Sequence, residues 1–151
     1  MSDPFDEDLA ARKHTAAHDP AFPARREAAY AAIVAALDQA LGPLGYGLKG
    51  STWTRPSPRG RSAVHLQRSR YGWDARIVLR FVTPDGGPPD HPDWPEDDDL
   101  TLWDFAEDHP RDPGTLAFVD VLDDPGTLAV ALDLLTTRAL PWLEALHDAG
   151  A

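Results

Sequence analysis

The chain has 151 residues, of which 42% are apolar, and a formal net charge of −11. This length fits one compact domain, because domains usually contain about 100–150 residues. The absence of cysteine excludes a disulfide scaffold, a thiol nucleophile and a cysteine-ligated zinc site. The acidic balance disfavours general binding to nucleic acid or anionic lipid.

The first 20 residues are polar, and we expect a mobile N-terminal segment over 1–20 followed by a single domain over 21–151. At most, a short helix from Asp6 to Lys13 is expected in this segment. The segment lacks the basic patch and apolar run of a secretion signal. No apolar run in the chain reaches the length of a membrane span, about 20 residues. The sequence therefore predicts a cytoplasmic protein without a membrane partner.

Residues 23–44 predict the first long helix. Apolar side chains recur there at steps of three and four, which places them on one helical face: Tyr30, Ile33, Val34, Leu37, Leu41 and Leu44. Pro23 suits the first turn of this helix, and Gly42 with Pro43 indicates its end.

From residue 45 to residue 83 the apolar period changes to two, which is typical of strands. We expect strands near 45–49, 52–56, 62–69 and 73–83, joined by short turns into an antiparallel meander. The fourth strand has one fully apolar row: Trp73, Ala75, Ile77, Leu79 and Phe81. That row predicts that one face of the sheet packs on helices and that the opposite face is polar.

We expect a long acidic surface loop over residues 84–112, because proline, glycine and aspartate dominate the first half of this segment. Short strands are expected at 100–105, within this stretch, and at 115–122.

A second long helix is expected after Asp124 and Pro125, which supply a cap and a first-turn proline. Pro141 should kink this helix near Thr137, because it removes a backbone donor. Together the elements predict an α+β domain: a small antiparallel sheet of four to six strands with two long helices packed on one face.

Basic and acidic residues are separated along the chain. Residues 49–83 carry eight basic side chains and one acidic one, whereas residues 84–112 carry eleven acidic side chains and one basic one. One interpretation is that the two blocks neutralise each other within the fold. The other is that the basic surface binds an anionic partner, while the acidic loop gates that surface or binds a cationic partner.

Several short motifs occur in an order that resembles a bacterial family. The first helix runs into Leu41-Gly42-Pro43-Leu44-Gly45-Tyr46, then come Gly50-Ser51-Thr52-Trp53-Thr54-Arg55 and His65-Leu66-Gln67-Arg68-Ser69, and the last helix contains Leu140-Pro141-Trp142-Leu143. This order resembles the bacterial domain-of-unknown-function family number 4304 over residues 30–83 and 124–147. The resemblance implies the fold and points to Gln67 and Ser69, but it carries no established activity. His65 and the acidic segment 84–112 depart from the family pattern.

Five polar residues of the third and fourth strands form the leading candidate site: His65, Gln67, Ser69, Arg76 and Arg80. On one exposed sheet face they would offer two guanidinium groups and several neutral donors to a carboxylate or phosphate. In the alternative interpretation, Gln67 and Ser69 form hydrogen bonds across strands or to the last helix, and the arginines are solvated or pair with the acidic loop.

Other chemistries have weaker signals in the sequence. Suitable metal ligands occur in the acidic segment without a known metal motif: His91, Asp93, Asp97, Asp98, Asp99 and His109. Trp94, Trp103 and Phe105 could form a partner-binding segment, or Trp103 and Phe105 pack on the sheet edge. We predict no metal and no cofactor, and we do not expect nucleic acid as the partner.

The sequence contains neither a nucleophile elbow nor a phosphate-binding loop. The first hypothesis is therefore a non-catalytic module that binds another protein through the polar, basic sheet face or the acidic loop. An immunity-type inhibitor is one form of such a module. The alternative is an enzyme or a binder of a small anionic ligand, built around Arg76, Arg80 and His65. A concave pocket walled by these three residues would favour the alternative, and a flat face would favour the module.

Overall fold

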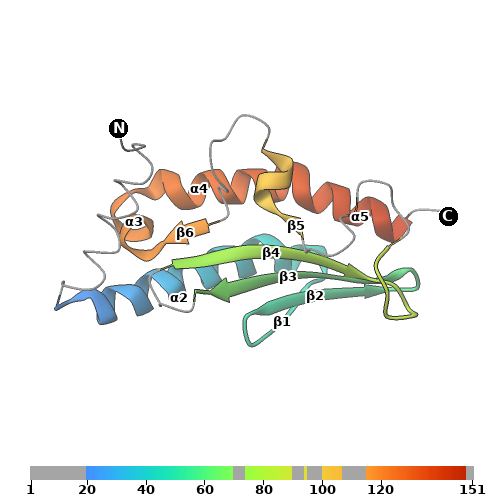
Figure 1. The fold of residues 1–151 in the computed structure, drawn as a ribbon, viewed down its shortest axis with the longest axis horizontal. Helices are drawn as coiled ribbons and strands as arrows, with labels where there is room; N and C mark the ends of the chain where they lie inside the picture. Colours follow the sequence, from blue (N-terminus) through green and yellow to red (C-terminus); the bar gives the residue numbers. More distant parts are fainter. Residues whose placement is uncertain (1–19, 70–73, 90–93, 95–99, 107–114, 149–151) are drawn as a thin grey trace, which may run out of the picture.

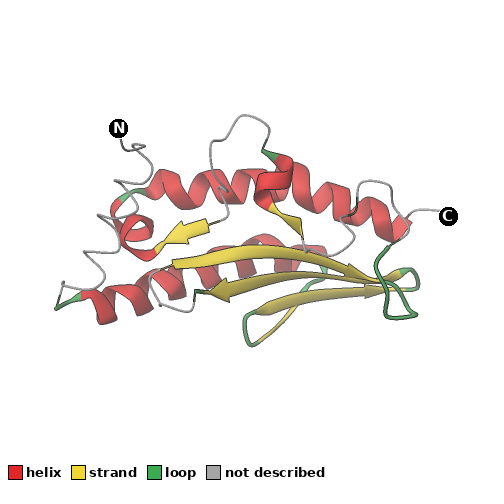
Figure 2. Ribbon diagram, viewed as in Figure 1, coloured by secondary structure: helices red, strands yellow, loops and turns green. Residues whose placement is uncertain are grey.

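The structure, a computed structural model, describes residues 20–69, 74–89, 94, 100–106 and 115–148. Within these residues a six-stranded antiparallel sheet forms one layer and helices form the other (Figures 1 and 2). The predicted α+β fold, with two long helical segments on one face of the sheet, is confirmed. The expected helix from Asp6 to Lys13 lies outside the described residues. No helix in the described part of the chain is long and apolar enough to span a membrane.

The first helix, α2 (Phe22–Leu41), buries the predicted apolar stripe. Ile33, Leu37 and Leu41 have no exposed surface and form part of the core. The helix ends three residues earlier than expected, because a 3-10 turn, η1 (Gly42–Leu44), follows it. As a result, Leu44 is 43% exposed and does not extend the stripe.

Four of the strands form the expected meander, and two short strands extend the sheet. The strands are β1 (Gly47–Lys49), β2 (Thr52–Ser57), β3 (Gly60–Arg68), β4 (Asp74–Val82), β5 (Leu100–Thr101) and β6 (Thr115–Ala117). The order is β1-β2-β3-β4-β5, and β6 pairs with the first residues of β4, on the same edge of β4 as β5. The predicted apolar row of the fourth strand is buried from Ala75 to Phe81, and Trp73 lies outside the described residues.

Both short strands are shorter than expected. After Thr101 the chain forms a 3-10 helix, η2 (Leu102–Phe105), in which the Asp104 carboxylate accepts the Thr101 backbone N–H at 2.8 Å. β6 pairs with β4 only as far as Ala117, which lies opposite Asp74, the first residue of β4. The chain then continues directly into a short helix, α3 (Phe118–Asp123).

The second long helical segment consists of α4 (Pro125–Leu134), a π-helical segment η3 (Leu135–Ala139) and α5 (Leu140–Asp148). The predicted cap is confirmed, because the Asp124 side chain accepts the Gly126 N–H at 3.0 Å. The kink was expected near Thr137, and the structure has the π-helical segment at this position. Pro141 cannot donate a backbone hydrogen bond to the preceding turn, and the Thr137 hydroxyl donates to the Asp133 carbonyl at 2.6 Å.

Candidate functional site

The sheet face that the helices leave uncovered, called the open face below, carries most of the predicted site residues. Gln67 lies directly opposite Arg76 on neighbouring strands, and His65 lies opposite Val78. Gln67, Arg76 and Arg80 are exposed, and His65 is half-buried. The predicted alternation of an apolar inner face and a polar outer face holds for these four residues, whereas Asp74 and Val78, which have the same outward parity on β4, are buried.

His65 has a hydrogen-bond partner on the neighbouring strand. Its Nδ1 lies 2.8 Å from the Thr52 hydroxyl, and the two residues are paired in the β2–β3 ladder. His65 thus makes a cross-strand hydrogen bond of the kind that the alternative interpretation assigned to Gln67 and Ser69. This bond orients the imidazole within the open face.

Ser69 and Arg80 lie at opposite ends of this group of residues. Ser69 follows the end of β3, where its backbone N–H donates to the Asp74 carbonyl at 3.0 Å. Arg80 lies six residues along β4 from Asp74, a separation of about 20 Å in an extended strand. The structure therefore places Ser69 and Arg80 near opposite ends of the sheet and does not bring all five residues together.

The two predicted arginines lie in one row along β4. Arg76 and Arg80 are separated by four residues, about 13 Å along the strand, and Val78 between them is only 2% exposed. Their backbone positions thus lie along an extended surface and do not converge on a common cavity. This spacing suits two separate anionic groups on an extended partner.

Strand parity divides the arginines of the basic block into two groups. Arg55 and Arg68 lie on the helix-covered face, where Arg55 pairs with Glu144 of α5 at 2.8 Å and Arg68 pairs with Glu27 of α2 at 2.9 Å. Arg68 also lies over the Tyr30 ring, 3.9 Å from its centroid. These two arginines therefore fasten the sheet to the helices, whereas those of the opposite parity face outward.

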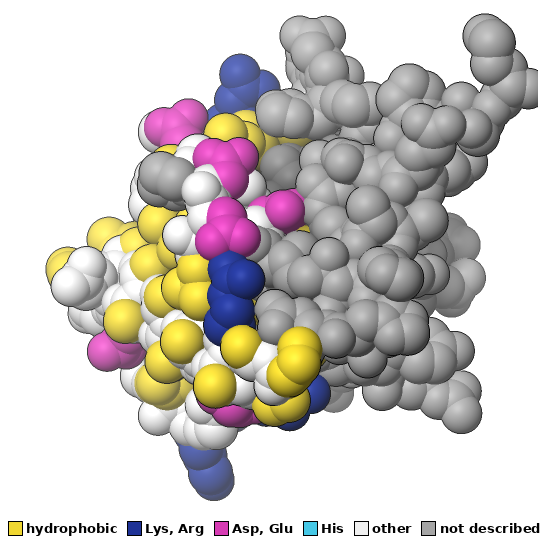
Figure 3. Space-filling model, turned by 90° about the vertical axis from the view of Figure 1, so that its left-hand side faces the viewer, with side chains coloured by type: hydrophobic (Ala, Val, Ile, Leu, Met, Phe, Trp, Pro, Cys, Tyr) yellow, Lys and Arg dark blue, Asp and Glu magenta, His cyan; other side chains and the backbone are white. Residues whose placement is uncertain are grey.

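Charges of both signs mix on another part of the surface. At the end of the molecule where α2 begins, acidic and basic side chains lie among apolar ones (Figure 3). Arg25 of α2 pairs with Asp123 of α3 at 2.6 Å. Arg76 of the open face differs from this arrangement, because it forms no ion pair with the described residues.

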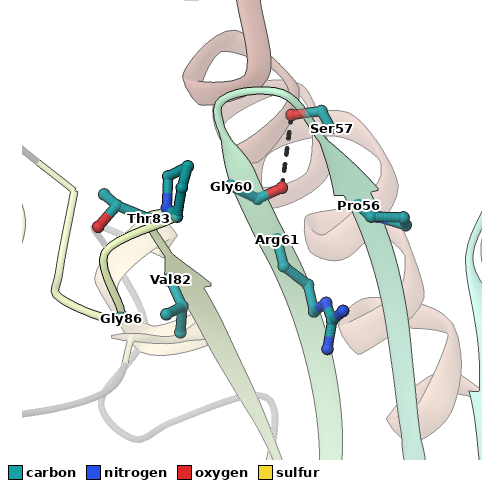
Figure 4. A pocket seen from close by; sticks show the side chains of 8 residues that line it. Pro56, Ser57, Gly60, Arg61, Val82, Thr83 and Gly86 are labelled. Atoms are coloured by element: carbon teal, nitrogen blue, oxygen red, sulfur yellow. Dashed lines mark hydrogen bonds between the residues drawn. The ribbon is translucent and has the colours of Figure 1, made fainter.

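One further arginine of the open face was not among the predicted site residues. Arg61 is exposed on β3, opposite Val82, and has the same parity as His65 and Gln67. It lines a pocket of about 450 Å³ at the end of the sheet, called the end pocket below (Figure 4). The residues that line this pocket are Pro56, Ser57, Gly60, Arg61, Val82, Thr83, Pro84 and Gly86. None of the five predicted site residues is among them.

A second polar cluster lies on the helix-covered face, next to the end pocket. His147 of α5 reaches two serines of the sheet: its Nδ1 lies 2.5 Å from the Ser57 hydroxyl and its Nε2 lies 2.8 Å from the Ser62 hydroxyl. Ser62 in turn lies 2.8 Å from the phenolic oxygen of Tyr46. These four side chains form a continuous hydrogen-bonded network that ties the last helix to β2, β3 and the segment before β1.

The direction of the hydrogen bonds in this network follows from the buried phenol. Tyr46 is 5% exposed, and Ser62 is its side-chain partner among the described residues. If Tyr46 donates to Ser62, then Ser62 donates to Nε2 of His147, and the Nδ1–H of His147 donates to Ser57. The reverse direction would leave the phenolic hydrogen without an acceptor, which is costly in a buried position.

The direction of these hydrogen bonds determines whether His147 can act as a general base toward Ser57. A general base must accept the proton of its nucleophile, but here His147 donates to Ser57. The Ser57 oxygen also accepts the Arg59 backbone N–H at 3.2 Å. The pair is therefore arranged to hold α5 against the β2–β3 hairpin, and it does not activate a serine nucleophile.

Burial favours the neutral forms of both titratable groups in the network. It lowers the pKa of His147, an effect reinforced by Arg55 and opposed by Glu144 and Asp148. Burial also raises the pKa of Tyr46, and the nearby Glu144 acts in the same direction, whereas the Ser62 hydrogen bond and Arg55 oppose it. The network is thus an uncharged one near neutral pH.

The aromatic residues of the acidic segment pack on the last helix. Trp94 stacks on Trp142 of α5 with ring centroids 5.7 Å apart, and Phe105 meets the same ring edge-on at 5.8 Å. Phe105 thus contacts α5, and the expectation that it packs on the sheet edge stays a prediction. The side chain of Trp103 and the candidate metal ligands His91, Asp93, Asp97, Asp98, Asp99 and His109 lie outside the described residues.

Comparison of the chain with known protein families, curated proteins and solved structures found no match. The resemblance to family number 4304 therefore stays a prediction.

Proposed function

We propose that this chain is a non-catalytic module that binds an acidic surface of another protein through its open face. The observation that carries the proposal is the grouping of Arg61, Arg76 and Arg80 as exposed side chains on the sheet face that the helices leave uncovered. Because side chains alternate between the two faces of a strand, all three arginines point to the open face and none is buried in the core.

The chemistry of the open face suits carboxylates. Guanidinium groups bind carboxylates through paired, charge-assisted hydrogen bonds. Gln67, opposite Arg76, adds a neutral amide donor at the same level of the sheet. A local basic face on a chain of net charge −11 would attract an acidic partner in one orientation, because the rest of the molecule repels it.

Two observations favour a protein surface over a small anionic ligand. The end pocket is lined by residues other than His65, Arg76 and Arg80. Arg76 and Arg80 are also about 13 Å apart along their strand, with the buried Val78 between them. Small-molecule sites are usually concave and bury most of the ligand, whereas this face is an extended row.

An immunity-type inhibitor would be one form of such a module. In that form the acidic segment 84–112 would meet a basic toxin surface. Most of this segment lies outside the described residues, so our proposal is based on the open face.

The test compares two double variants in which two positive charges are removed. Arg76→Gln with Arg80→Gln changes the open face, and Arg26→Gln with Arg138→Gln removes the same charge from α2 and η3 in the helical layer. The proteins are immobilised, an extract of the native cells is passed over them, and bound protein is eluted with salt and purified. Its affinity for each variant is then measured by calorimetry.

We expect an acidic protein whose affinity falls by at least about tenfold in the open-face variant, because hydrogen bonds to charged groups are lost. Its affinity should stay within about twofold in the matched variant, which changes charges outside the interface. Equal affinity for the two double variants, a basic captured protein, or retention of no protein by the wild-type chain would each overturn the proposal. Circular dichroism of both variants establishes that they are folded.

A further inference from the structure

The end pocket is continuous with the open face. Arg61 pairs with Val82 across the β3–β4 ladder, and Arg80 precedes Val82 by two residues on the same side of β4. Diagonal neighbours of this kind have Cα atoms about 7–8 Å apart. A partner that contacts Arg80 would therefore also reach the mouth of the pocket.

Backbone geometry gives the pocket fixed walls. Gly60 has a φ of +147°, and a Cβ at this position would lie 2.4 Å from the Val82 carbonyl oxygen, so the hairpin packs here without a side chain. On the other side, the Gly86 N–H donates to the Thr83 carbonyl and the Thr83 N–H donates to the Gly87 carbonyl, each at 2.9 Å. The turn after β4 is thus held in place by its own hydrogen bonds.

The lining combines apolar surfaces with one positive charge. Pro56, Val82 and Pro84 supply the apolar surfaces, and Arg61 extends from β3 between Val82 and Pro56 (Figure 4). Arg61 forms no ion pair with the described residues. The volume of about 450 Å³ falls within the range of ligand sites, about 300–1,000 Å³.

We propose that the end pocket receives an apolar side chain of the acidic partner, with a carboxylate next to that side chain bound by Arg61. This inference rests on the proposed function and names the feature of the partner that the open face recognises at its end. The apolar walls remove the side chain from water, and the guanidinium selects the neighbouring anion.

The test uses N-acetyl-leucine as a probe, because it combines an apolar side chain with one carboxylate. N-acetyl-leucine amide lacks the charge, and acetate lacks the side chain. Each is titrated into the ¹⁵N-labelled protein while the backbone amide signals of Gly60, Thr83 and Gly86 are followed by NMR. We expect saturable shifts with N-acetyl-leucine, at a Kd of about 1–10 mM, as suits one small contact.

Binding of N-acetyl-leucine amide should be at least about tenfold weaker, because it lacks the carboxylate that Arg61 binds. Acetate should give no saturable shifts, because it lacks the apolar side chain. Arg61→Gln should weaken N-acetyl-leucine binding by about tenfold or more, and Arg26→Gln, on α2, should leave it unchanged. Val82→Glu provides a second variant, since its carboxylate would occupy Arg61 and block the probe. No saturation by N-acetyl-leucine, or equal binding of the amide, would overturn the inference.

Failure of this inference and failure of the proposed function give different results. If the pocket binds no probe while the captured protein still depends on Arg76 and Arg80, the proposed function stands and this inference is wrong. If the probe binds but Arg61→Gln leaves the affinity for the captured protein unchanged, the pocket serves small carboxylates and the inference about the partner is wrong as well.

Discussion

Gln67 of β3 lies directly opposite Arg76 of β4 on the open face, and both side chains are exposed. Their neighbours in sequence, Leu66 and Ile77, are also paired in the ladder but lie fully in the core. At this level of the sheet, one step from Gln67 to Leu66 or from Arg76 to Ile77 leads from the surface to the core. Changes to the outward-facing residues can alter binding without altering the fold.

The first prediction concerns the stability of the open-face variants. Replacing Arg76 and Arg80 together with alanine should change the free energy of unfolding by no more than about 0.5–1 kcal/mol, because substitutions on an exposed surface have small effects. Urea denaturation followed by circular dichroism measures this. Loss of the cooperative transition would show that these arginines are structural.

The second prediction concerns pH and His147. Because burial lowers the pKa of His147 in the folded state, the unfolded chain binds a proton first as the pH falls. The contribution of the neutral imidazole to stability is therefore complete above the ordinary pKa, about 6.5, and is lost as the pH falls toward the lower folded value. Urea midpoints measured between pH 4 and pH 8, a range of about two units around that value, should decrease on the acidic side.

The variant His147→Gln serves as the control for this pH dependence. It removes the titrating group, so the decrease in midpoint below the ordinary histidine pKa should become smaller than in the wild-type chain. An unchanged pH profile in the variant would show that another group causes the decrease. On the alkaline side, the raised pKa of Tyr46 means that stability should fall above the ordinary tyrosine pKa, about 10, as the unfolded chain ionises first.

The third prediction concerns the backbone at the end of the β2–β3 hairpin. Gly60→Ala should destabilise the protein by about 2–4 kcal/mol, because the new Cβ would meet the Val82 carbonyl oxygen at a positive φ. Gly47→Ala is the matched change, since nothing lies within 4 Å of a Cβ at that position and its φ is not positive. A similar stability for both variants would contradict the prediction.

The fourth prediction concerns the aromatic contact between the acidic segment and α5. Trp94→Ala and Trp142→Ala should each lower stability, and the double variant should lower it by less than the sum. The expected coupling is about 0.5–1.5 kcal/mol, the range of aromatic pairs. Thermal unfolding of the four proteins measures this cycle. Additive effects would show that the stacking of the two rings adds nothing to stability.

The sequence predicted the parity of the open face because alternation along a strand is a local property. The same rule applied to β2 and β3 would have assigned Arg55 and Arg68 to the helix-covered face, since Arg55 shares its parity with Trp53 and Arg68 with Leu66. The lengths of the short strands were not predictable in this way. β5, for example, ends where the Asp104 carboxylate accepts the Thr101 N–H and the chain enters η2, which the alternation of side chains does not reveal.

The network around His147 had no signal in the sequence. Ser57 and Ser62 are 90 and 85 residues away from His147, and the three residues belong to no common motif. Only the packing of α5 across the end of the sheet brings them together. Arg61 differs, because its parity could have placed it with Gln67, although the pocket beside it depends on the turn at Thr83 and Gly86.

The π-helical segment has a consequence for how the last helix tolerates changes in length. In this segment the Leu140 N–H bonds to the Leu135 carbonyl, five residues back, which accommodates one residue more than a regular turn. Deleting one residue between Leu135 and Ala139 would restore an ordinary helix and leave the imidazole facing its two serines. The same deletion between Leu140 and His147 would rotate the imidazole by about 100° around the helix axis. The chain can therefore lose a residue within the π-helical segment but not between that segment and His147.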